Sequence, residues 1–346
     1  MLNLENKIIL ITGGTGSFGK NFVRYLLEKT GAKKIIVFSR DELKQSQMAH
    51  EFDDERLRFF LGDVRDLSRL QRAFSGVDIV IHAAALKQVP ILEYNPFEAV
   101  KTNILGSQNV IEAGIDEKVQ KVLLISTDKA VQPINLYGST KLCAEKLFIA
   151  GNSYAAGQTK FSAVRYGNVL GSRGSIVESL LNHNGKDEVK ITDEVMTRFW
   201  ITLPQSFELV MFALEQMAGG EIFVPKIPSM KLVDLFDAVV PQYKRKVIGI
   251  RPGEKMHETL LTEDESRHAY ELEKYYVVIP EFELGQVLQE KYKNLGKILP
   301  PRFRYTSDTN SEWLTKGQLN LLINPPNFSN EKLGGQVVIN NRIIKE

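Results

Sequence analysis

The stretch that decides the fold lies near the start of the chain, where residues 7–19 read KIILITGGTGSFG. Its first half is a continuous apolar run, typical of a strand buried on both faces of a parallel sheet. Gly13, Gly16 and Gly19 follow directly and open a helical pattern. This spacing lets the backbone turn tightly and approach a pyrophosphate at the helix N-terminus. The stretch therefore predicts the first strand–helix turn of a dinucleotide-binding fold.

Strands and helices continue to alternate through the first half of the chain. Similar apolar runs predict buried strands at 34–38, 77–81, 122–125, 161–164 and 221–224. Helix-length segments separate most of them, so the expected fold class is α/β, a Rossmann-type doubly wound parallel sheet. Ligands of such sheets bind beyond the carboxyl ends of the strands.

The second half of the chain has a less regular pattern. We expect residues 1–170 to form an NADP-binding Rossmann domain, with returns to the sheet at about 195–225. Residues 171–323 place Pro, Gly and charge clusters between short elements, which predicts a smaller C-terminal substrate-binding domain. Residues 324–346 are polar and Asn-rich and predict a flexible tail.

Composition indicates an ordinary soluble protein, with a formal charge of +2 over 346 residues. The basic cluster 244–246 is too short to predict nucleic-acid binding. A single cysteine, Cys143, excludes an intrachain disulfide and suits a reducing compartment. No apolar run approaches the ~20 residues that cross a bilayer, so we expect a cytoplasmic protein without membrane insertion. No metal is expected, because no cluster has metal-ligand spacing.

The end of the second predicted strand bears on the choice of cofactor. An NAD site normally has an acidic residue here, whereas an Arg accommodates the 2′-phosphate of NADP. Ser39 and Arg40 therefore favour NADP, with Lys44 as a helper. Asp41 and Glu42 weaken that preference, unless they only favour a helix N-terminus.

Asp63 follows the third strand and has two open interpretations. Its carboxylate could accept a hydrogen bond from the adenine amine, or it could cap the next helix. The residues expected to contact the cofactor are Gly13, Thr15, Gly16, Ser17, Phe18, Gly19, Ser39, Arg40, Asp41, Glu42, Leu43, Lys44, Asp63, Val64, Ala84, Lys87, Tyr137 and Lys141.

Residues 126–141 carry the candidate chemistry. Tyr137 and Lys141 are four apart, which places them on one face of a helix. The ammonium of Lys141 can stabilise a phenolate and lower the pKa of Tyr137 from roughly 10 toward neutrality. Such a Tyr can take a proton from a sugar hydroxyl while a nicotinamide takes the hydride. Asp128 and Lys129 add a second acid and base, although alone they would suggest a surface ion pair or a helix cap.

Together these residues resemble the extended short-chain dehydrogenase/reductase family. Within it, the chain is similar to the inverting UDP-N-acetylglucosamine 4,6-dehydratases of the pseudaminic acid pathway. In related dehydratases of 2-hydroxy sugars, Asp-Glu typically stands where this chain has Asp128-Lys129. The motifs that carry the resemblance are ITGGTGSFGK at 11–20, FSRDELK at 38–44, HAAALK at 82–87, STDKA at 126–130, NLYG at 135–138, RYGNV at 165–169, MTRFW at 196–200 and RPGEK at 251–255.

The resemblance implies UDP-N-acetylglucosamine as the substrate and a mechanism with these groups. Tyr137 removes the 4-hydroxyl proton as hydride passes from C4 to NADP, and Thr127, preferred over Ser126, hydrogen-bonds the 4-oxygen. Neutral Lys129 then takes the C5 proton, and Asp128 protonates the departing C6 hydroxyl. Hydride returns to C6 and a proton adds to the opposite face of C5. The product is UDP-2-acetamido-2,6-dideoxy-β-L-arabino-hexos-4-ulose, so the enzyme is a lyase.

The resemblance also extends into the second domain and to the assembly. Arg198 and Arg251 suit phosphate oxygens, and Glu254 could hold a ribose hydroxyl or orient Arg251. We expect His82 and His257 to be packed or hydrogen-bonded rather than catalytic. Relatives form dimers or hexamers, so a homo-oligomer is implied. The residues expected to bind the substrate are Lys87, Asn168, Val169, Ser172, Arg173, Arg198, Arg251 and Glu254.

Two other functions stay open at this point. A UDP-N-acetylhexosamine 4-epimerase would use the same Tyr137, Lys141 and cofactor, but it has no need for Asp128 and Lys129 because no water is eliminated. A non-catalytic NADP-binding regulatory protein would not need all four of these groups.

Overall fold

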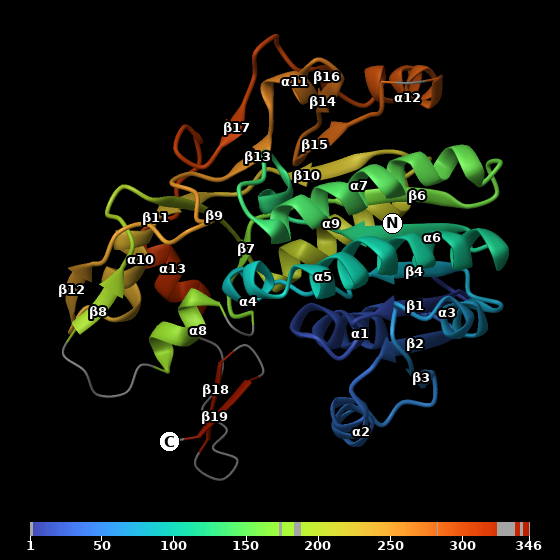
Figure 1. The fold of residues 1–346 in the computed structure, drawn as a ribbon, viewed down its shortest axis with the longest axis horizontal. Helices are drawn as coiled ribbons and strands as arrows, with labels where there is room; N and C mark the ends of the chain where they lie inside the picture. The colour runs from blue at the N-terminus through green and yellow to red at the C-terminus, as the bar shows by residue number, and fades with distance from the viewer. Residues whose placement is uncertain are drawn as a thin grey trace. The chain divides into compact units, whose positions relative to one another are not determined.

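A computed structural model describes residues 3–172, 175–182, 188–281, 283–323, 336–339 and 342–345 (Figure 1). The chain divides into two compact units, each built from three segments. Unit 1 comprises Met1–Tyr166, Gln205–Lys226 and Thr259–Tyr305, and unit 2 comprises Gly167–Pro204, Ile227–Glu258 and Thr306–Glu346. None of the described helices is both long and apolar enough to span a membrane.

Unit 1 is built on a ten-stranded sheet with the order β16-β14-β15-β10-β6-β5-β4-β1-β2-β3. All neighbouring strands from β10 to β3 pair in parallel, whereas β15, β14 and β16 extend the sheet antiparallel. This confirms the predicted Rossmann-type sheet. Its strands are β1 (Ile8–Thr12), β2 (Lys34–Ser39), β3 (Leu57–Leu61), β4 (Ile79–His82), β5 (Lys121–Ile125), β6 (Lys160–Val164), β10 (Ile222–Pro225), β14 (Ala269–Glu271), β15 (Tyr275–Val278) and β16 (Lys297–Ile298).

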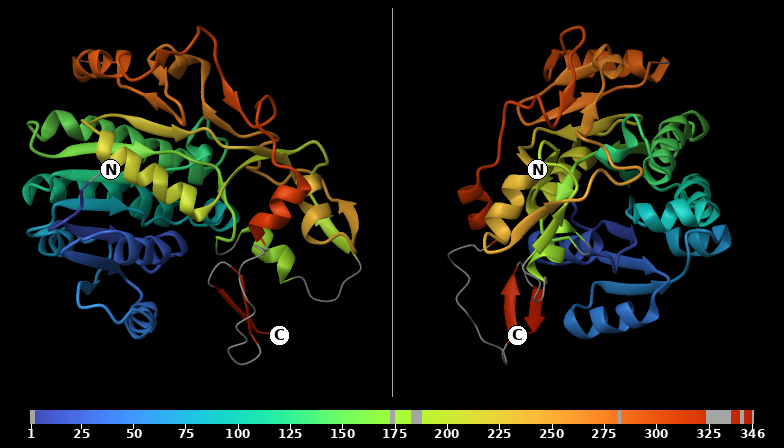
Figure 2. Two further views of the ribbon diagram at one scale, coloured as in Figure 1. Left: turned by 180° about the vertical axis from the view of Figure 1, so that it is seen from behind. Right: turned by 60° about the vertical axis from the view of Figure 1, so that its left-hand side comes forward.

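Helices cover both faces of this sheet, which explains why its central strands are apolar throughout. On one face α1 (Ser17–Lys29) packs against α9 (Leu203–Gln216), where Phe22 and Phe207 lie 5.4 Å apart between ring centroids. On the other face α6 (Gly106–Asp116) lies between α3 (Leu67–Phe74) and α7 (Leu136–Tyr154). The left view of Figure 2 brings α9 to the front, and Figure 1 brings α6 and α7 to the front.

Several shorter elements complete unit 1 and its boundary with unit 2. They are α2 (Glu42–Glu51), α4 (Val89–Tyr94), α5 (Pro96–Ala99), the π-helical segment η1 (Val100–Leu105), the 3₁₀ turn η2 (Asp128–Ala130), β13 (Thr259–Leu261), α11 (Glu263–Ser266), α12 (Glu283–Lys293) and β17 (Tyr305–Thr306).

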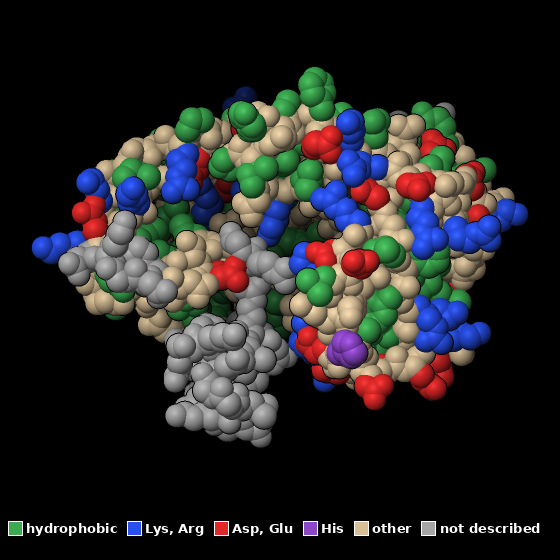
Figure 3. Space-filling view, turned by 60° about the horizontal axis from the view of Figure 1, so that its bottom comes forward, with side chains coloured by type: hydrophobic (Ala, Val, Ile, Leu, Met, Phe, Trp, Pro, Cys, Tyr) green, Lys and Arg blue, Asp and Glu red, His purple; other side chains and the backbone are tan. Residues whose placement is uncertain are grey.

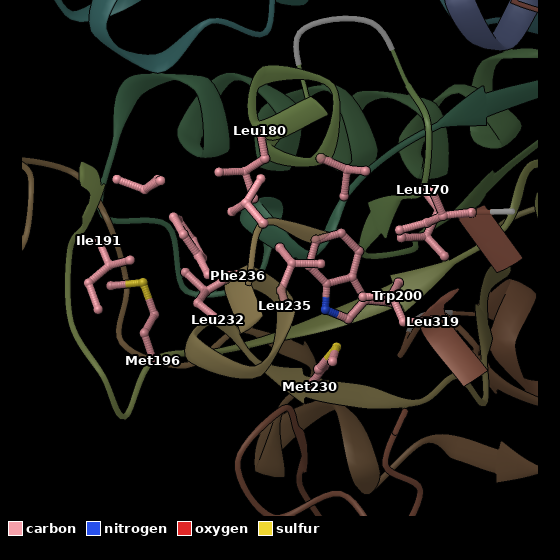
Figure 4. Close-up of a cluster of buried hydrophobic side chains, with 14 residues drawn as sticks. Leu170, Leu180, Ile191, Met196, Trp200, Met230, Leu232, Leu235, Phe236 and Leu319 are labelled. Carbon is pink, nitrogen blue, oxygen red and sulfur yellow. The ribbon is translucent and has the colours of Figure 1, made fainter. Parts of the chain in front are cut away.

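Unit 2 has its own sheet and core. The strands β7 (Asn168–Val169), β9 (Thr197–Ile201) and β11 (Ser229–Lys231) form a three-stranded sheet in the order β11-β9-β7. Figure 4 shows its buried cluster, in which the Trp200 indole lies beside Leu235. The remaining elements are α8 (Ile176–Leu181), β8 (Glu188–Ile191), α10 (Leu232–Val239), β12 (Lys244–Val247), α13 (Lys316–Ile323), β18 (Gln336–Ile339) and β19 (Arg342–Lys345).

The observed division differs from the expected one in three places. Residues 167–170, expected in the first domain, belong to unit 2, where β7 pairs with β9. Residues 259–305 belong to unit 1, because β14 to β16 continue its sheet beyond β10. Residues 197–201, expected to return to the first sheet, form β9 in unit 2 instead. In the segment expected to be a flexible tail, β18 and β19 pair antiparallel.

The surface mixes charges of both signs. On the face shown in Figure 3, basic and acidic side chains of the described residues are intermixed. This distribution is in keeping with the formal net charge of +2.

Candidate active site

The glycine turn after β1 fits a nucleotide cofactor. Gly13 has a φ of +67°, and a side chain there would lie 2.8 Å from the backbone nitrogen of Ala84. A Cβ at Gly19 would lie 2.6 Å from the Gly13 carbonyl oxygen. The glycines therefore allow the turn, the start of α1 and the loop after β4 to meet at the carboxyl end of the sheet, where free backbone N–H groups of a helix attract phosphate.

Two side chains of the glycine turn make contacts within the protein, one by a hydrogen bond and the other by ring packing. The Thr15 hydroxyl hydrogen-bonds the Ser39 hydroxyl at 2.8 Å, which joins the turn to the end of β2. The Phe18 ring stacks on Phe22 at 5.4 Å and so belongs to the contact between α1 and α9. A cofactor contact by Phe18 would therefore come from its backbone.

At the end of β2, Arg40 is exposed and Asp41 caps the next helix. Asp41 caps α2 by accepting a 3.0 Å hydrogen bond from the backbone N–H of Lys44, and its carboxylate also pairs with the Lys44 ammonium. This is the helix N-terminal role that the sequence left open for Asp41. Arg40 keeps 55% of its side chain exposed, with a nitrogen 3.5 Å from a carboxylate oxygen of Asp63.

Asp63 is not a helix cap. Asp66 caps α3 instead, by accepting a 3.0 Å hydrogen bond from the backbone N–H of Arg69. Asp63 accepts hydrogen bonds from the backbone N–H and the guanidinium of Arg65, at 2.8–3.0 Å. Burial raises the pKa of the Asp63 carboxyl, but these bonds outweigh it and hold the pKa below its usual range. The capping interpretation of Asp63 is therefore wrong.

At the end of β4, His82 is a structural residue. Its ring nitrogens lie 2.7 Å from the Thr12 hydroxyl and 3.2 Å from the Ser107 hydroxyl, and its ring stacks on Phe148. Burial, helped by the charge of Lys141, lowers its pKa to about 3, so the ring is neutral. The expectation of a packed, hydrogen-bonded histidine is confirmed.

The loop after His82 is held by a residue that the sequence analysis missed. The Asn103 side chain accepts a hydrogen bond from the Leu86 N–H and donates one to the Leu86 carbonyl, both at 2.9 Å. It also donates to the Thr140 hydroxyl at 3.0 Å, which ties this loop to α7. Asn103 lies in η1, and π-helical segments are frequent at functional sites but leave no periodic signal in a sequence. Neighbouring Lys87 is exposed.

After β5 the structure brings an acid and a base into contact. Asp128 has a fully buried side chain, and its Oδ1 accepts hydrogen bonds from the Thr127 hydroxyl at 2.9 Å and the Lys129 ammonium at 3.0 Å. The Lys129 side chain remains 25% exposed. The Asp128 N–H donates to the Tyr166 carbonyl at 3.0 Å. A surface ion pair is therefore excluded, because one partner is wholly buried.

Helix α7 positions Tyr137 and Lys141 in its first two turns. Asn135 caps the helix by accepting a 2.8 Å hydrogen bond from the Gly138 N–H. The Lys141 ammonium donates to the Ile125 carbonyl at 2.7 Å. Burial lowers the pKa of Lys141 to about 8, although a carboxylate further along the helix opposes this shift.

The ionisation of Tyr137 differs from the prediction. Burial raises the pKa of Tyr137 to about 12, the Lys129 ammonium and a hydrogen bond with Thr127 lower it, and Asp128 raises it. The expected shift toward neutrality is therefore wrong for the protein alone, because the cost of burying a phenolate is greater than the stabilisation by nearby cations. The same interactions join Tyr137 electrostatically to the Asp128–Lys129 turn.

In unit 2, the two described arginines that were expected to bind the substrate differ in burial. Arg198 is buried and donates to the carbonyls of Thr197 at 2.7 Å and Met256 at 3.1 Å, with Glu254 at 3.5 Å. Arg251 is exposed, and its backbone N–H donates to Glu254 at 3.4 Å. The carboxylate of Glu254 thus joins the two arginine positions.

The remaining predicted residues of unit 2 belong to β7 or follow it. Asn168 and Val169 form β7, Ser172 follows it, and Arg173 lies outside the described residues. A nitrogen of His257 lies 2.8 Å from the Thr197 hydroxyl, as expected for a hydrogen-bonded histidine.

Comparison with known proteins assigns the family. A family model described as "Polysaccharide biosynthesis protein" matches residues 9–280. The inverting UDP-N-acetylglucosamine 4,6-dehydratase of Campylobacter jejuni (strain 81-176) is 50% identical over 327 residues, covering 92% of this chain and 98% of that protein. A UDP-glucose 4-epimerase of Rickettsia massiliae is 43% identical over 284 residues, covering 78% and 82%.

Among solved structures, Pen from Bacillus thuringiensis superposes with a TM-score of 0.84 at 38% identity, covering 93% of this chain and 98% of that one. A dTDP-glucose 4,6-dehydratase of Streptomyces venezuelae, at 21% identity and a TM-score of 0.64, shares the fold. The chain therefore belongs to the polysaccharide biosynthesis protein family of extended short-chain dehydrogenases/reductases.

Proposed function

We propose that the protein is an NADP-dependent UDP-N-acetylglucosamine 4,6-dehydratase that inverts C5. One observation carries this proposal: a buried carboxylate, Asp128, in contact with the ammonium of Lys129 at 3.0 Å, in a turn coupled to Tyr137. Elimination of water needs an acid and a base in addition to the group that oxidises C4. The inverting dehydratase of Campylobacter jejuni, 50% identical to this chain, supports the same function.

The Asp128–Lys129 contact offers a simple route to the required protonation states. Moving one proton from Lys129 Nζ to Asp128 Oδ1 gives a neutral amine and a carboxylic acid. Burial of the carboxylate favours this neutral pair, because taking charges out of water is costly even when they are paired. The amine can then take the C5 proton while the acid protonates the C6 hydroxyl. Elimination leaves an ammonium and a carboxylate, so the pair returns to its starting charges.

Tyr137 serves as the base for the sugar 4-hydroxyl. It must be ionised to accept that proton, and a pKa of about 12 in the protein alone shows how strongly burial opposes this. When bound, an oxidised nicotinamide would supply a hydride acceptor, later a hydride donor, and a positive charge that favours ionised Tyr137. Lys141, one turn along α7, contributes charge of the same sign, and so does Lys129 until it gives its proton to Asp128. Thr127 contributes a hydroxyl for the 4-oxygen.

The cofactor is proposed to be NADP on the basis of the end of β2. The carboxylate of Asp41 is used in capping α2, so it is poorly placed to accept hydrogen bonds from a ribose. Arg40 keeps more than half of its side chain exposed and provides a guanidinium for a 2′-phosphate. The glycine turn, with no room for side chains at positions 13 and 19, suits the pyrophosphate.

For the nucleotide half of the substrate, we propose that Arg251 binds the diphosphate. Its exposed guanidinium can form paired hydrogen bonds with phosphate oxygens. Arg198 is engaged by backbone carbonyls and Glu254, so its role is to hold the turn that carries Arg251.

The proposed setting is the cytoplasm, in the first step toward pseudaminic acid or a similar surface-glycan sugar. We also propose a homo-oligomer. Support comes from large exposed apolar side chains on α4 and α5, namely Ile91, Tyr94 and Phe97, which a second copy of the chain could cover.

The deciding experiment is incubation with UDP-N-acetylglucosamine in deuterated water, followed by proton NMR. A new C6 methyl signal, one deuteron at C5 and L-arabino couplings are expected. D-xylo couplings would refute inversion, and conversion to the galacto sugar without a methyl would establish an epimerase. The Rickettsia relative is named an epimerase of UDP-glucose. No change with NADP bound would refute this substrate.

A pair of variants tests the base. Lys129→Ala should abolish the methyl signal and leave NADP binding intact, whereas Lys146→Ala, at an exposed position of α7, should retain both. Normal dehydration by Lys129→Ala would overturn the assignment.

A further inference from the structure

Close to the turn at residues 127–129 lies a buried ionic cluster that no step of the proposed reaction uses. Arg165 and Glu145 are each only 1% exposed, and their closest atoms are 2.7 Å apart. The Arg165 guanidinium also donates to Glu265 at 3.0 and 3.2 Å and to the Leu260 carbonyl at 2.9 Å. Breaking such a buried pair is costly, so the cluster holds one geometry.

Glu145 connects this cluster to the catalytic residues. It follows Lys141 by four residues on α7, which places the two on one helix face. The Ser126 hydroxyl donates to the Glu145 carboxylate, and the Lys141 ammonium donates to the carbonyl of the preceding residue, Ile125. The last residue of β5 and the residue after it are thus both tied to one face of α7. The turn that carries Thr127, Asp128 and Lys129 begins immediately after them.

The charges of the cluster also balance that of Lys141. Two carboxylates and one guanidinium carry a net charge of −1, which the Lys141 ammonium neutralises. Burial lowers the pKa of Lys141, whereas Glu145 raises it. His82, the titratable group that faces Lys141 from β4, is neutral, and Tyr137 lies one turn away on α7. Among the groups that act on Lys141, Glu145 is therefore the one that favours its charged form.

We propose that Glu145 is a positioning residue of the active site: it fixes the end of β5 against α7 and supplies the counter-charge for the Lys141 ammonium. Arg165 and Glu265 in turn fix the Glu145 carboxylate. The inference rests on the proposed function and deepens it, because it says that Glu145 supports Lys141, the residue that assists Tyr137.

Glu145→Gln tests this assignment, since it keeps the size of the side chain and an acceptor for Ser126 but removes the charge. Without that charge, the pKa of Lys141 falls below its present value of about 8, and the ammonium is lost at lower pH. The alkaline limb of the pH profile of kcat/KM should move to lower pH by about one pH unit. Glu145→Asp should restore part of the shift, and Lys146→Ala should leave the profile unchanged.

A second readout does not depend on turnover. NMR of protein with isotope-labelled lysine, recorded across the pH range and assigned with Lys141→Arg, reports the protonation of the buried Lys141 amine without a reagent having to reach it. Its midpoint should fall in Glu145→Gln even if wild-type protein proves inactive on the proposed substrate, so the two proposals can fail separately. An unchanged midpoint and an unchanged alkaline limb would overturn the inference. If Glu145→Gln does not fold, Glu265→Gln, which removes one carboxylate from the same cluster, should give a smaller shift in the same direction.

Discussion

Gly138→Ala should damage catalysis without damaging cofactor binding. Gly138 lies in the first turn of α7, directly after Tyr137. A Cβ built there would lie 3.0 Å from both the Lys129 carbonyl carbon and the Pro133 Cβ, and the Lys129 carbonyl oxygen would lie closer still, well inside the 3.0 Å limit of real contacts. The substitution therefore pushes the Asp128–Lys129 turn away from Tyr137.

The size of the effect follows from this overlap. Relief of the contact requires a displacement of roughly 1 Å between α7 and the turn, and a misplacement of that size costs about 10²-fold in rate. Overpacking should also lower the free energy of unfolding by about 1–3 kcal/mol. The glycine turn that fits NADP is a separate element, so the Kd for NADP should change little.

The assay is the rate of appearance of the C6 methyl signal, together with NADP binding by fluorescence and a thermal melt. Gly317→Ala is the matched control, because it places the same methyl group on an exposed helical position with no atom within 4 Å. Dehydration by Gly138→Ala within threefold of the wild-type rate, with an unaltered melting temperature, would refute the reasoning.

Three further predictions concern other parts of the molecule. Arg40→Ala should weaken NADP binding by about 10–100-fold and leave NAD binding nearly unchanged, as titrations with both cofactors would reveal; equal losses for both would contradict the 2′-phosphate role. Arg165→Met should lower the free energy of unfolding in urea by about 3–5 kcal/mol, because it leaves two carboxylates facing each other; a loss below 1 kcal/mol would contradict the buried cluster. Phe97→Glu should reduce the mass measured by light scattering, whereas the same mass for both proteins would exclude this surface from the assembly.

The sequence predicts the parallel half of the sheet well, and there is a physical reason. Strands such as β1 and β5 are covered by helices on both faces of the sheet, so residues 8–11 and 122–125 are continuous apolar runs. The antiparallel edge is different. β14 and β16 are only three and two residues long, too short for any periodic pattern. They join the sheet of unit 1 through β15, whose partner β10 lies far away in the chain, as the pairing of Ile222 with Val278 shows.

In the site, local motifs are predictable and burial is not. The spacing of Tyr137 and Lys141 defines their helix face, but the rise in the pKa of Tyr137 depends on the depth at which α7 packs. Asp63 and Asp66 both precede α3, and only the observed hydrogen bonds distinguish which one caps it. Arg165 and Glu265 are 100 residues apart, so no local pattern could reveal their contact.

The interleaving of the two units has a consequence for synthesis on the ribosome. Unit 1 needs residues up to 305 of the 346, because β10, β15, β14 and β16 all come from the second half of the chain. Until β10 emerges, β6 is an open edge with unpaired backbone groups, the kind of surface that invites aggregation. A nascent chain paused near residue 200 would carry nearly all the residues of the proposed chemistry and yet present this edge. Chaperone dependence of this protein should therefore be greatest midway through translation, and should end once the strand that covers β6 has been made.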